Sequence, residues 1–293
     1  MKSKNLFILL LILGTAFWGI SFPVTKTAIG SGSSYTFLFY RFFLATIILS
    51  ILFFKYFSKI DKSILKNALL LAVPLTFGIS MQTLGVKMTS ASQCAFIAGI
   101  CVVIIPIIKL VFFRHIVKLK IWLAATVALM GLMIISVNKN FSIGLGDLYT
   151  FIGAIGFAVY LIKVEKYSLL KNILPTIVPM FFFCTIIMFG FTVMDNNTVW
   201  IPQNEGFWLG ILYCSIFSTA YMYTISNISQ RYISAEKVAI IYLFEPIFAA
   251  VAAYFILDES LSIKLLLGGS LIFIGTLISE LKFKKKRTLE LSE

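Results

Sequence analysis

The stretch SAEKVAIIYLFEPIFAAVAAYFIL, residues 234–257, decides the fold of this chain. From Val238 to Leu257 it contains a single charged residue, Glu245. A helix of about 20 apolar residues crosses the roughly 30 Å hydrocarbon core of a bilayer, and it satisfies its own backbone hydrogen bonds in lipid. We therefore predict a transmembrane helix over residues 234–257.

Nine further apolar runs of similar character occur along the chain. They are residues 6–29, 35–57, 66–86, 92–113, 121–137, 145–165, 174–195, 206–228 and 262–281. The composition agrees, because 60% of the 293 residues are hydrophobic and only 13% are charged, which is outside the range of ordinary soluble domains. We predict an all-α membrane protein with ten transmembrane helices and almost no extramembrane domain.

The basic residues predict the orientation of these helices. The formal net charge is +13, and 19 of the 25 Lys and Arg residues fall in the N-terminal segment, the even-numbered connections and the tail. Lys and Arg accumulate on the cytoplasmic side of membrane proteins, so we expect both termini to be cytoplasmic, in a bacterial inner membrane. Because the basic residues are spread over six segments rather than gathered in one domain, we expect no nucleic-acid partner.

An internal repeat with an offset of 144 residues divides the chain into two halves. The offset relates Ser90-Ala91 to Ser234-Ala235, Gly131 to Gly275, and Arg114-His115 to Asp258-Glu259. Five predicted helices separate related elements, so the halves must have opposite orientations in the membrane. We predict a first five-helix repeat over residues 1–140, an inverted second repeat over residues 141–281, and a basic cytoplasmic tail over residues 282–293. Inverted repeats of this kind are typical of transporters.

The sequence resembles the drug/metabolite transporter (DMT) superfamily, and within it the EamA-like transporter family, in several short motifs and in their order. The motifs are Phe17-Trp18-Gly19 with Thr25-Lys26, Arg41-Phe-Phe-Leu-Ala45, Thr89-Ser-Ala-Ser92, Phe96-Ile-Ala-Gly99, Ser234-Ala235, Glu245-Pro246, Asp258-Glu259, Gly268-Gly269 and Gly275. The resemblance covers nearly the whole chain. One departure is His115, where the family usually has an acidic residue, and we assign that position no role.

The resemblance implies a basket of ten helices around a central cavity. It implies that the first, third, fourth, sixth, eighth and ninth helices line this cavity, and that the protein exports or exchanges small metabolites such as amino acids. A fold of this kind hosts many substrates, so the resemblance does not identify the transported molecule.

Glu245 is the leading candidate for substrate binding or coupling, because ionisable residues within a membrane span are costly. It lies near mid-membrane and directly precedes Pro246, which removes a backbone donor and predicts a kink. A carboxylate there can bind an amino group or carry a proton. The alternative is a structural carboxylate that braces the kink.

Two other cations lie within predicted helices. Arg41 can meet a substrate carboxylate in a bidentate geometry, or it can snorkel to the outer interface or form a structural ion pair. Lys109 lies near the basic loop that begins at Arg114, so we expect it to snorkel inward, and we expect the same of Lys163 and Glu165.

Trp18, Tyr160, Tyr221 and Tyr242 lie on predicted helices that the family uses for its cavity. Together they predict an aromatic wall for apolar or cationic groups, although each ring can instead face lipid or pack against neighbours. Gln82 and Asn227 offer further hydrogen bonds, with solvent contact as the alternative.

Several chemistries are not expected. The single histidine excludes a multi-histidine metal site, the four cysteines lie in apolar runs as small hydrophobes, and the patterns of a phosphate-binding loop and a nucleophile elbow do not occur. We expect no catalytic residues, no cofactor and no enzymatic activity. The expected partners are the lipid bilayer and a small metabolite, with the protein as a monomer or homodimer.

We therefore expect a secondary active transporter of a small organic metabolite, such as an amino acid or amino-acid derivative, driven by a proton gradient or by exchange. The alternative with the same architecture is a flippase for a lipid or lipid-linked precursor, which needs a cavity that opens sideways to the bilayer. A non-transporting scaffold or sensor is a third class, and it usually carries a soluble domain.

Overall fold

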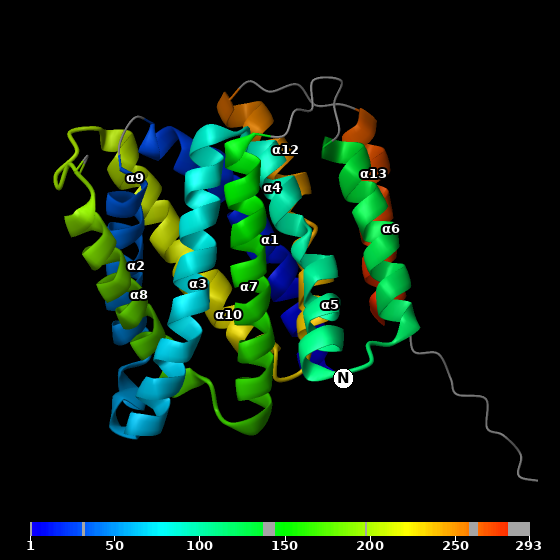
Figure 1. Cartoon of the computed structure of the whole chain (residues 1–293), viewed down its shortest axis with the longest axis horizontal. Coiled ribbons are helices and arrows are strands. Elements are labelled where there is room, and N and C mark those ends of the chain that lie inside the picture. The colour runs from blue at the N-terminus through cyan, green and yellow to red at the C-terminus, as the bar shows by residue number, and fades with distance from the viewer. Residues whose placement is uncertain (1, 31–32, 137–143, 197, 258–262, 281–293) are drawn as a thin grey trace, which may run out of the picture.

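A computed structural model describes residues 2–30, 33–136, 144–196, 198–257 and 263–280, and all regular secondary structure within them is helical (Figure 1). The elements up to residue 136 are α1 Lys2–Ile29, α2 Ser34–Leu52, the 3-10 helix η1 Phe54–Lys59, α3 Lys62–Met88, α4 Ala91–Gly99, α5 Cys101–Phe113 and α6 Leu119–Ser136. The elements from residue 145 are α7 Leu145–Leu170, α8 Leu174–Met194, α9 Glu205–Tyr213, the π-helix η2 Cys214–Tyr221, α10 Met222–Ser229, α11 Ala235–Tyr242, α12 Glu245–Leu257 and α13 Ile263–Glu280. The predicted all-α class is confirmed for these residues. The motif Asp258-Glu259 and the tail 282–293 lie outside them.

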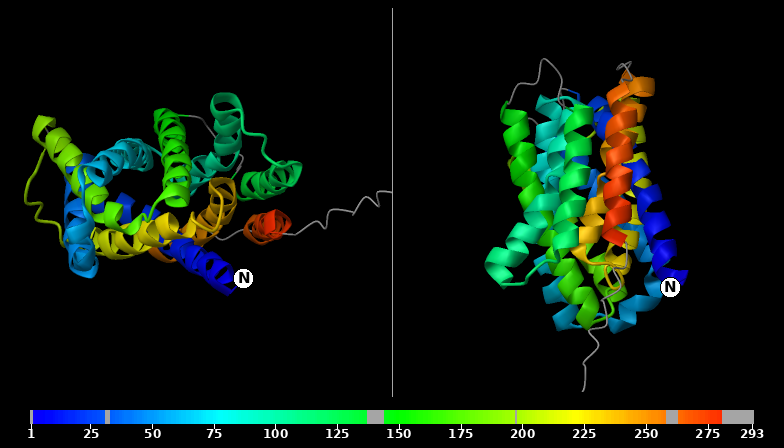
Figure 2. Two further views of the ribbon diagram at one scale, coloured as in Figure 1. Left: turned by 90° about the horizontal axis from the view of Figure 1, so that it is seen from below. Right: turned by 90° about the vertical axis from the view of Figure 1, so that its right-hand side faces the viewer.

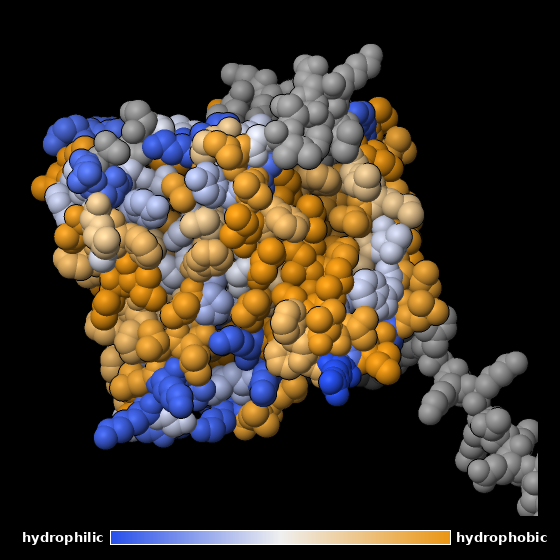
Figure 3. Space-filling view, in the orientation of Figure 1, coloured by the Kyte–Doolittle hydropathy of each residue, from blue (hydrophilic) through white to orange (hydrophobic). Residues whose placement is uncertain are grey.

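The helices have the length and surface of membrane-spanning segments. In the part of the chain that the structure describes, eight helical segments are long and apolar enough to cross a membrane, and two shorter apolar helices cover Leu119–Ile134 and Leu266–Ser279. Large apolar side chains such as Leu9 and Phe112 are well exposed on the helices. Figure 3 shows apolar residues across the middle of one face and hydrophilic residues gathered near its lower edge and upper left corner. The protein is a polytopic α-helical membrane protein.

Polar side chains fix where several helices begin. Ser33 accepts a hydrogen bond from the backbone N–H of Thr36 at 3.3 Å, and Asp61 accepts one from Ile64 at 2.6 Å. Ser90 caps α4 in the same way, through the N–H of Gln93 at 3.1 Å. Such caps satisfy backbone donors that the first helical turn leaves unpaired. The predicted helix over residues 35–57 ends earlier, at Leu52, where Phe53 leaves the helical conformation, and a 3-10 helix then leads to the cap at Asp61.

Two predicted helices are interrupted, and a third contains a π-helix. The first interruption is at Ile100, between α4 and α5, and the second is at Leu243 and Phe244, between α11 and α12. Pro246 follows the second one closely and has no N–H, so the carbonyl of Tyr242 has no donor four residues further on. The first interruption follows Gly99, a weak helix former.

Glycines allow the closest helix contacts. A Cβ on Gly19 of α1 would lie 2.7 Å from the backbone of α12, and one on Gly131 of α6 would lie 2.4 Å from the carbonyl oxygen of Gly268 in α13. α3 and α7 approach in the same way through Gly78 and Gly153. These contacts pair α1 with α12, α6 with α13 and α3 with α7, while α2 packs on α8 (Figures 1 and 2).

The bundle has two ends, which the helix directions define. We call the end at which α1 begins, at the bottom of Figure 1, the N face, and the opposite end the far face. α1 and α3 run from the N face to the far face, whereas α7 starts at the far face and returns. The predicted orientation makes the N face cytoplasmic.

Candidate functional site

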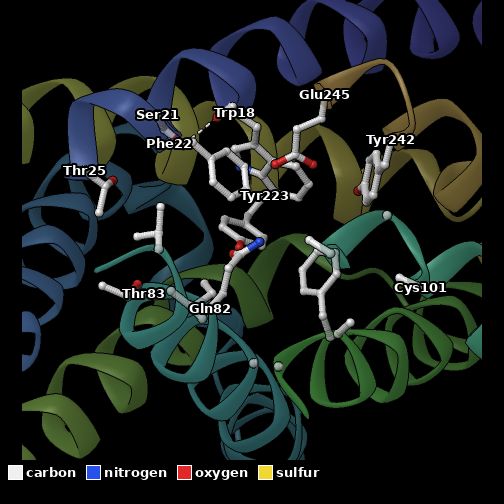
Figure 4. Close-up of a pocket in the computed structure, with 18 of the residues that line it drawn as sticks. Trp18, Ser21, Phe22, Thr25, Gln82, Thr83, Cys101, Tyr223, Tyr242 and Glu245 are labelled. Atoms are coloured by element: carbon white, nitrogen blue, oxygen red, sulfur yellow. Dashed lines mark hydrogen bonds between the residues drawn. The ribbon is translucent and has the colours of Figure 1, made fainter. Parts of the chain in front are cut away.

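A cavity lies among the helices (Figure 4), and its lining residues on α1, α3 and α7 belong to the parts of these helices nearer the far face. Its volume, measured as the space open to the centre of a water-sized sphere, is about 60 Å³. It is lined by α1, α3, α4, α5, α7, α10, α11 and α12, and by one residue of α2. These are the six helical segments that the resemblance implied, with Arg41 added. Small residues line part of the wall, and the charged, polar and aromatic side chains face them.

Glu245 is the first residue of α12, directly after the interruption. Its carboxylate points into the cavity toward Trp18 and Tyr223 (Figure 4). Within the described residues no hydrogen bond or ion pair partner is found for it. The positive end of the α12 dipole stabilises a carboxylate at this place. Glu245 is therefore positioned to accept a cationic group from a bound molecule.

Arg41 supplies the positive charge of the cavity. It is 6% exposed, and its Nε donates to Thr219 Oγ1 at 2.7 Å and its Nη2 to Ser218 Oγ at 3.2 Å. No carboxylate lies within 4.0 Å of it among the described residues. The expected alternatives of snorkelling and a structural ion pair are therefore both wrong. Because a guanidinium has five N–H donors, it retains donors for an anionic ligand group.

The wall of the cavity nearest mid-membrane is an aromatic cluster of Trp18, Phe157, Tyr223 and Tyr242. The Trp18 ring lies 4.9 Å from Tyr242, 5.3 Å from Tyr223 and 5.6 Å from Phe157, all in edge-to-face contact. Trp18 Nε1 also donates to the carbonyl oxygen of Ser218 at 2.7 Å. The rings touch each other directly, so they close the inner side of the cavity and leave Glu245 at its surface.

Two of the predicted aromatic residues do not line the cavity. Tyr160 is buried and donates to Asn227 Oδ1 at 2.6 Å, and Tyr221 donates to the carbonyl oxygen of Leu10 at 3.1 Å. Both therefore pack within the bundle, and so does Asn227. Gln82, in contrast, points into the cavity (Figure 4).

The cavity wall contains Phe157 and Tyr223 in place of Tyr160 and Tyr221, and the sequence did not predict these two residues. Tyr223 follows Tyr221 by two residues and therefore points about 200° away around the helix. The π-helix that ends at Tyr221 adds a residue to the turn before Tyr223 and shifts the face that reaches the cavity. Phe157 could have been found from its place one turn after Gly153, on the face where α7 packs on α3.

A second charged group lies toward the N face, beyond the aromatic cluster. Lys109 of α5 contacts Glu236 of α11, with Nζ 2.9 Å from Oε1, and it also contacts Glu165 of α7. The Lys109 side chain is 9% exposed, so the expectation that Lys109 and Glu165 snorkel to the interface is wrong. The two carboxylates compensate the buried ammonium group instead.

No metal centre is indicated by the described residues. They contain no group of three or more His, Cys, Asp or Glu side chains that could hold an ion. The four cysteines are free and buried, and Cys101 contributes to the cavity wall.

The cavity and its helices match a known family. Residues 5–137 and residues 144–281 each match the sequence profile of the EamA-like transporter family. The chain belongs to the EamA-like transporter family. The resemblance drawn from the motifs is confirmed, and this EamA-like protein is an integral multi-pass membrane transporter.

Relatives extend over most of the EamA-like chain. An "uncharacterized transporter" of Archaeoglobus fulgidus is 27% identical over 93% of this chain and 85% of its own length. The "uncharacterized transporter YcxC" of Bacillus subtilis is 26% identical over 92% of this chain and 90% of its own length. A solved crystal structure superimposes with a TM-score of 0.74 over 96% of this chain and 97% of that chain, at 12% identity, which shows a shared fold.

Proposed function

We propose that this EamA-like protein is a secondary active transporter of a small zwitterionic metabolite, of the amino-acid class, that works by alternating access. The observation that carries the proposal is the pairing of one carboxylate and one guanidinium in a single cavity, contributed by α12 and α2. Glu245 would receive the ammonium group of the substrate, and Arg41 its carboxylate. A cavity lined by both a carboxylate and a guanidinium would select a molecule that carries both charges.

The aromatic cluster supports this substrate class. A cation close to the face of an aromatic ring is attracted by the ring quadrupole, and Trp18 is the strongest ring type for this contact. A substrate ammonium held by Glu245 would lie beside Trp18 and Tyr242. The polar side chains of Thr25, Gln82 and Thr83 line the same cavity and offer further hydrogen bonds.

The packing of the helices supports an architecture of ten spans in two inverted repeats. The α3–α7 contact has its counterpart in the contact of α1 with the α9–α10 segment, and the α1–α12 contact has its counterpart in α7 with α4 and α5. The interruptions at Ile100 and Phe244 are separated by the 144 residues of the predicted offset. Two equivalent halves would give this pattern, and rocking of one half against the other would expose the cavity alternately.

We further propose that both termini are cytoplasmic in a bacterial inner membrane, and closure toward the N face then corresponds to an outward-facing state. The aromatic cluster and the ion pairs of Lys109 lie between the cavity and the N face. Transport would then be driven by a proton gradient or by exchange of one metabolite for another.

Transport by purified protein in proteoliposomes tests this function. A thermal-shift screen against amino acids, amines, nucleosides and vitamins first identifies ligands, because a ligand that binds the folded state raises its stability. We expect an amino acid or derivative to stabilise the protein and to be taken up, faster with a counter-substrate or a proton gradient. Binding without flux, or scrambling of phospholipids without metabolite uptake, would contradict the proposal and favour a sensor or a flippase respectively.

A further inference from the structure

We infer that Lys109, Glu165 and Glu236 form an ion-pair latch that holds the N face closed in this state and opens when substrate passes to that side. This inference rests on the proposed alternating-access function. The three residues come from α5, α7 and α11, which all line the cavity further toward the far face. These three side chains together are called the latch.

The latch joins the two halves of the chain. Lys109 lies in the first matched segment, and both acids lie in the second. Each contact of the ammonium group therefore joins the first half of the chain to the second. The side chains of Lys109, Glu165 and Glu236 are 9%, 14% and 5% exposed, so water hardly screens the contacts.

The latch lies on the same face of α5 as the cavity, about two helical turns further toward the N face. Cys101, Ile105 and Lys109 are spaced four residues apart and share one face of α5. Cys101 lines the cavity, Ile105 is fully buried at 0% exposure, and Lys109 is held by the acids. A substrate that leaves the cavity along this face of α5 must displace the buried Ile105 side chain and then separate the charged groups of the latch.

The charged groups of the latch suit a contact that opens during transport. Taking charged groups out of water opposes the attraction between them, so a buried ion pair contributes little net stability while it is closed. When the N face opens, water solvates all three charged groups, and the free-energy cost of burying them is recovered. Two carboxylates on one ammonium also leave a surplus negative charge, which favours hydration over burial.

Labelling of a buried cysteine tests the latch. The reporter is Ile105→Cys, probed with a membrane-impermeant thiol reagent added from the N face, with the modified residue located by mass spectrometry. In an otherwise unchanged protein the reporter should be protected. With Lys109→Gln added, the two acids lose their cation, and we expect the labelling rate at position 105 to rise at least tenfold. Glu165→Gln leaves the Lys109–Glu236 pair in place and should raise the rate less.

Two controls separate a latch from a merely structural ion pair. Ile177→Cys lies on α8, is also 0% exposed and does not line the cavity, so it should stay protected in every variant. The exchanged pair Lys109→Glu with Glu236→Lys keeps one cation and two acids, and it should restore protection at position 105.

Two results would overturn the inference. They are unchanged labelling at position 105 in Lys109→Gln, and an equal rise at positions 105 and 177, which would mean general loss of structure. Because the labelling needs no substrate, its failure would refute the latch and leave the proposed transport to be judged by the flux assay.

Discussion

Replacing Glu245 by glutamine removes the negative charge of the cavity and keeps the size of the side chain. A hydrogen bond to a charged group contributes about 1.5–3 kcal/mol. Since about 1.4 kcal/mol is a tenfold change in affinity, we expect the Kd of an amino-acid ligand to rise about 10- to 150-fold in Glu245→Gln. Flux at low substrate concentration should fall by a similar factor.

The same substitution should not destabilise the protein. Glu245 has no hydrogen bond or ion pair among the described residues, so no native contact is lost. Replacing the carboxylate by a neutral amide loses its attraction to the positive end of the α12 dipole, and the lower cost of burying a neutral group offsets that loss. We expect the thermal unfolding midpoint of the ligand-free protein to stay the same or to rise. Weaker binding together with undiminished stability would be the signature of a binding residue.

The assay compares Glu245→Gln with a matched control, Glu205→Gln. Glu205 lies exposed in the first turn of α9 and does not line the cavity. Both variants are measured for ligand-induced stabilisation and for flux and proton coupling in proteoliposomes. Undiminished flux and coupling in Glu245→Gln would remove Glu245 from the mechanism, and an equal loss in Glu205→Gln would show that the effect is not specific to the cavity.

Four further outcomes are expected. Gly19→Ala places a Cβ 2.7 Å from the backbone of α12. The thermal unfolding midpoint should therefore fall, and the free energy of unfolding should drop by about 1–3 kcal/mol. Gly190→Ala has nothing within 4 Å of its Cβ, and calorimetry should show a gain of about 0.5–1 kcal/mol. Arg41→Lys loses the planar fork, so titration should show at least tenfold weaker binding of a carboxylate ligand but little change for an amine without one. Trp18→Phe removes the donor to the Ser218 carbonyl oxygen, and denaturation should show a loss of about 1–3 kcal/mol in the free energy of unfolding.

Apolar runs predicted the helices because a helix in lipid satisfies all of its own backbone hydrogen bonds within the segment. They could not predict the interruptions at Ile100 and Phe244, since both residues are apolar and hydropathy does not change there. Pro246 signalled the second break, whereas the first has no proline beside it. Hydropathy also did not show that α2 ends at Leu52, because Phe53, where the backbone leaves the helical conformation, is as apolar as the helix before it.

The site was predictable where a residue is unusual for its surroundings. Glu245 and Arg41 are charges within apolar runs, and both line the cavity. Lys109 was predicted wrongly because its partners, Glu165 and Glu236, lie on helices distant in sequence. Local sequence shows that a charge is buried, but only the packing of the helices shows what compensates it.

The helix starts explain why the cavity tolerates an unpaired carboxylate at Glu245. Cys101 stands at the equivalent position in the first half at the 144-residue offset, and it too is the first residue of a helix that follows an interruption. The two interruptions thus present two helix N-termini, α5 and α12, to one cavity. Each supplies unpaired N–H groups and the positive end of a helix dipole. The second half uses this environment to hold a negative charge, whereas the first half carries a neutral thiol there. A carboxylate at both helix starts would place two like charges in one cavity, and a single acid avoids that repulsion.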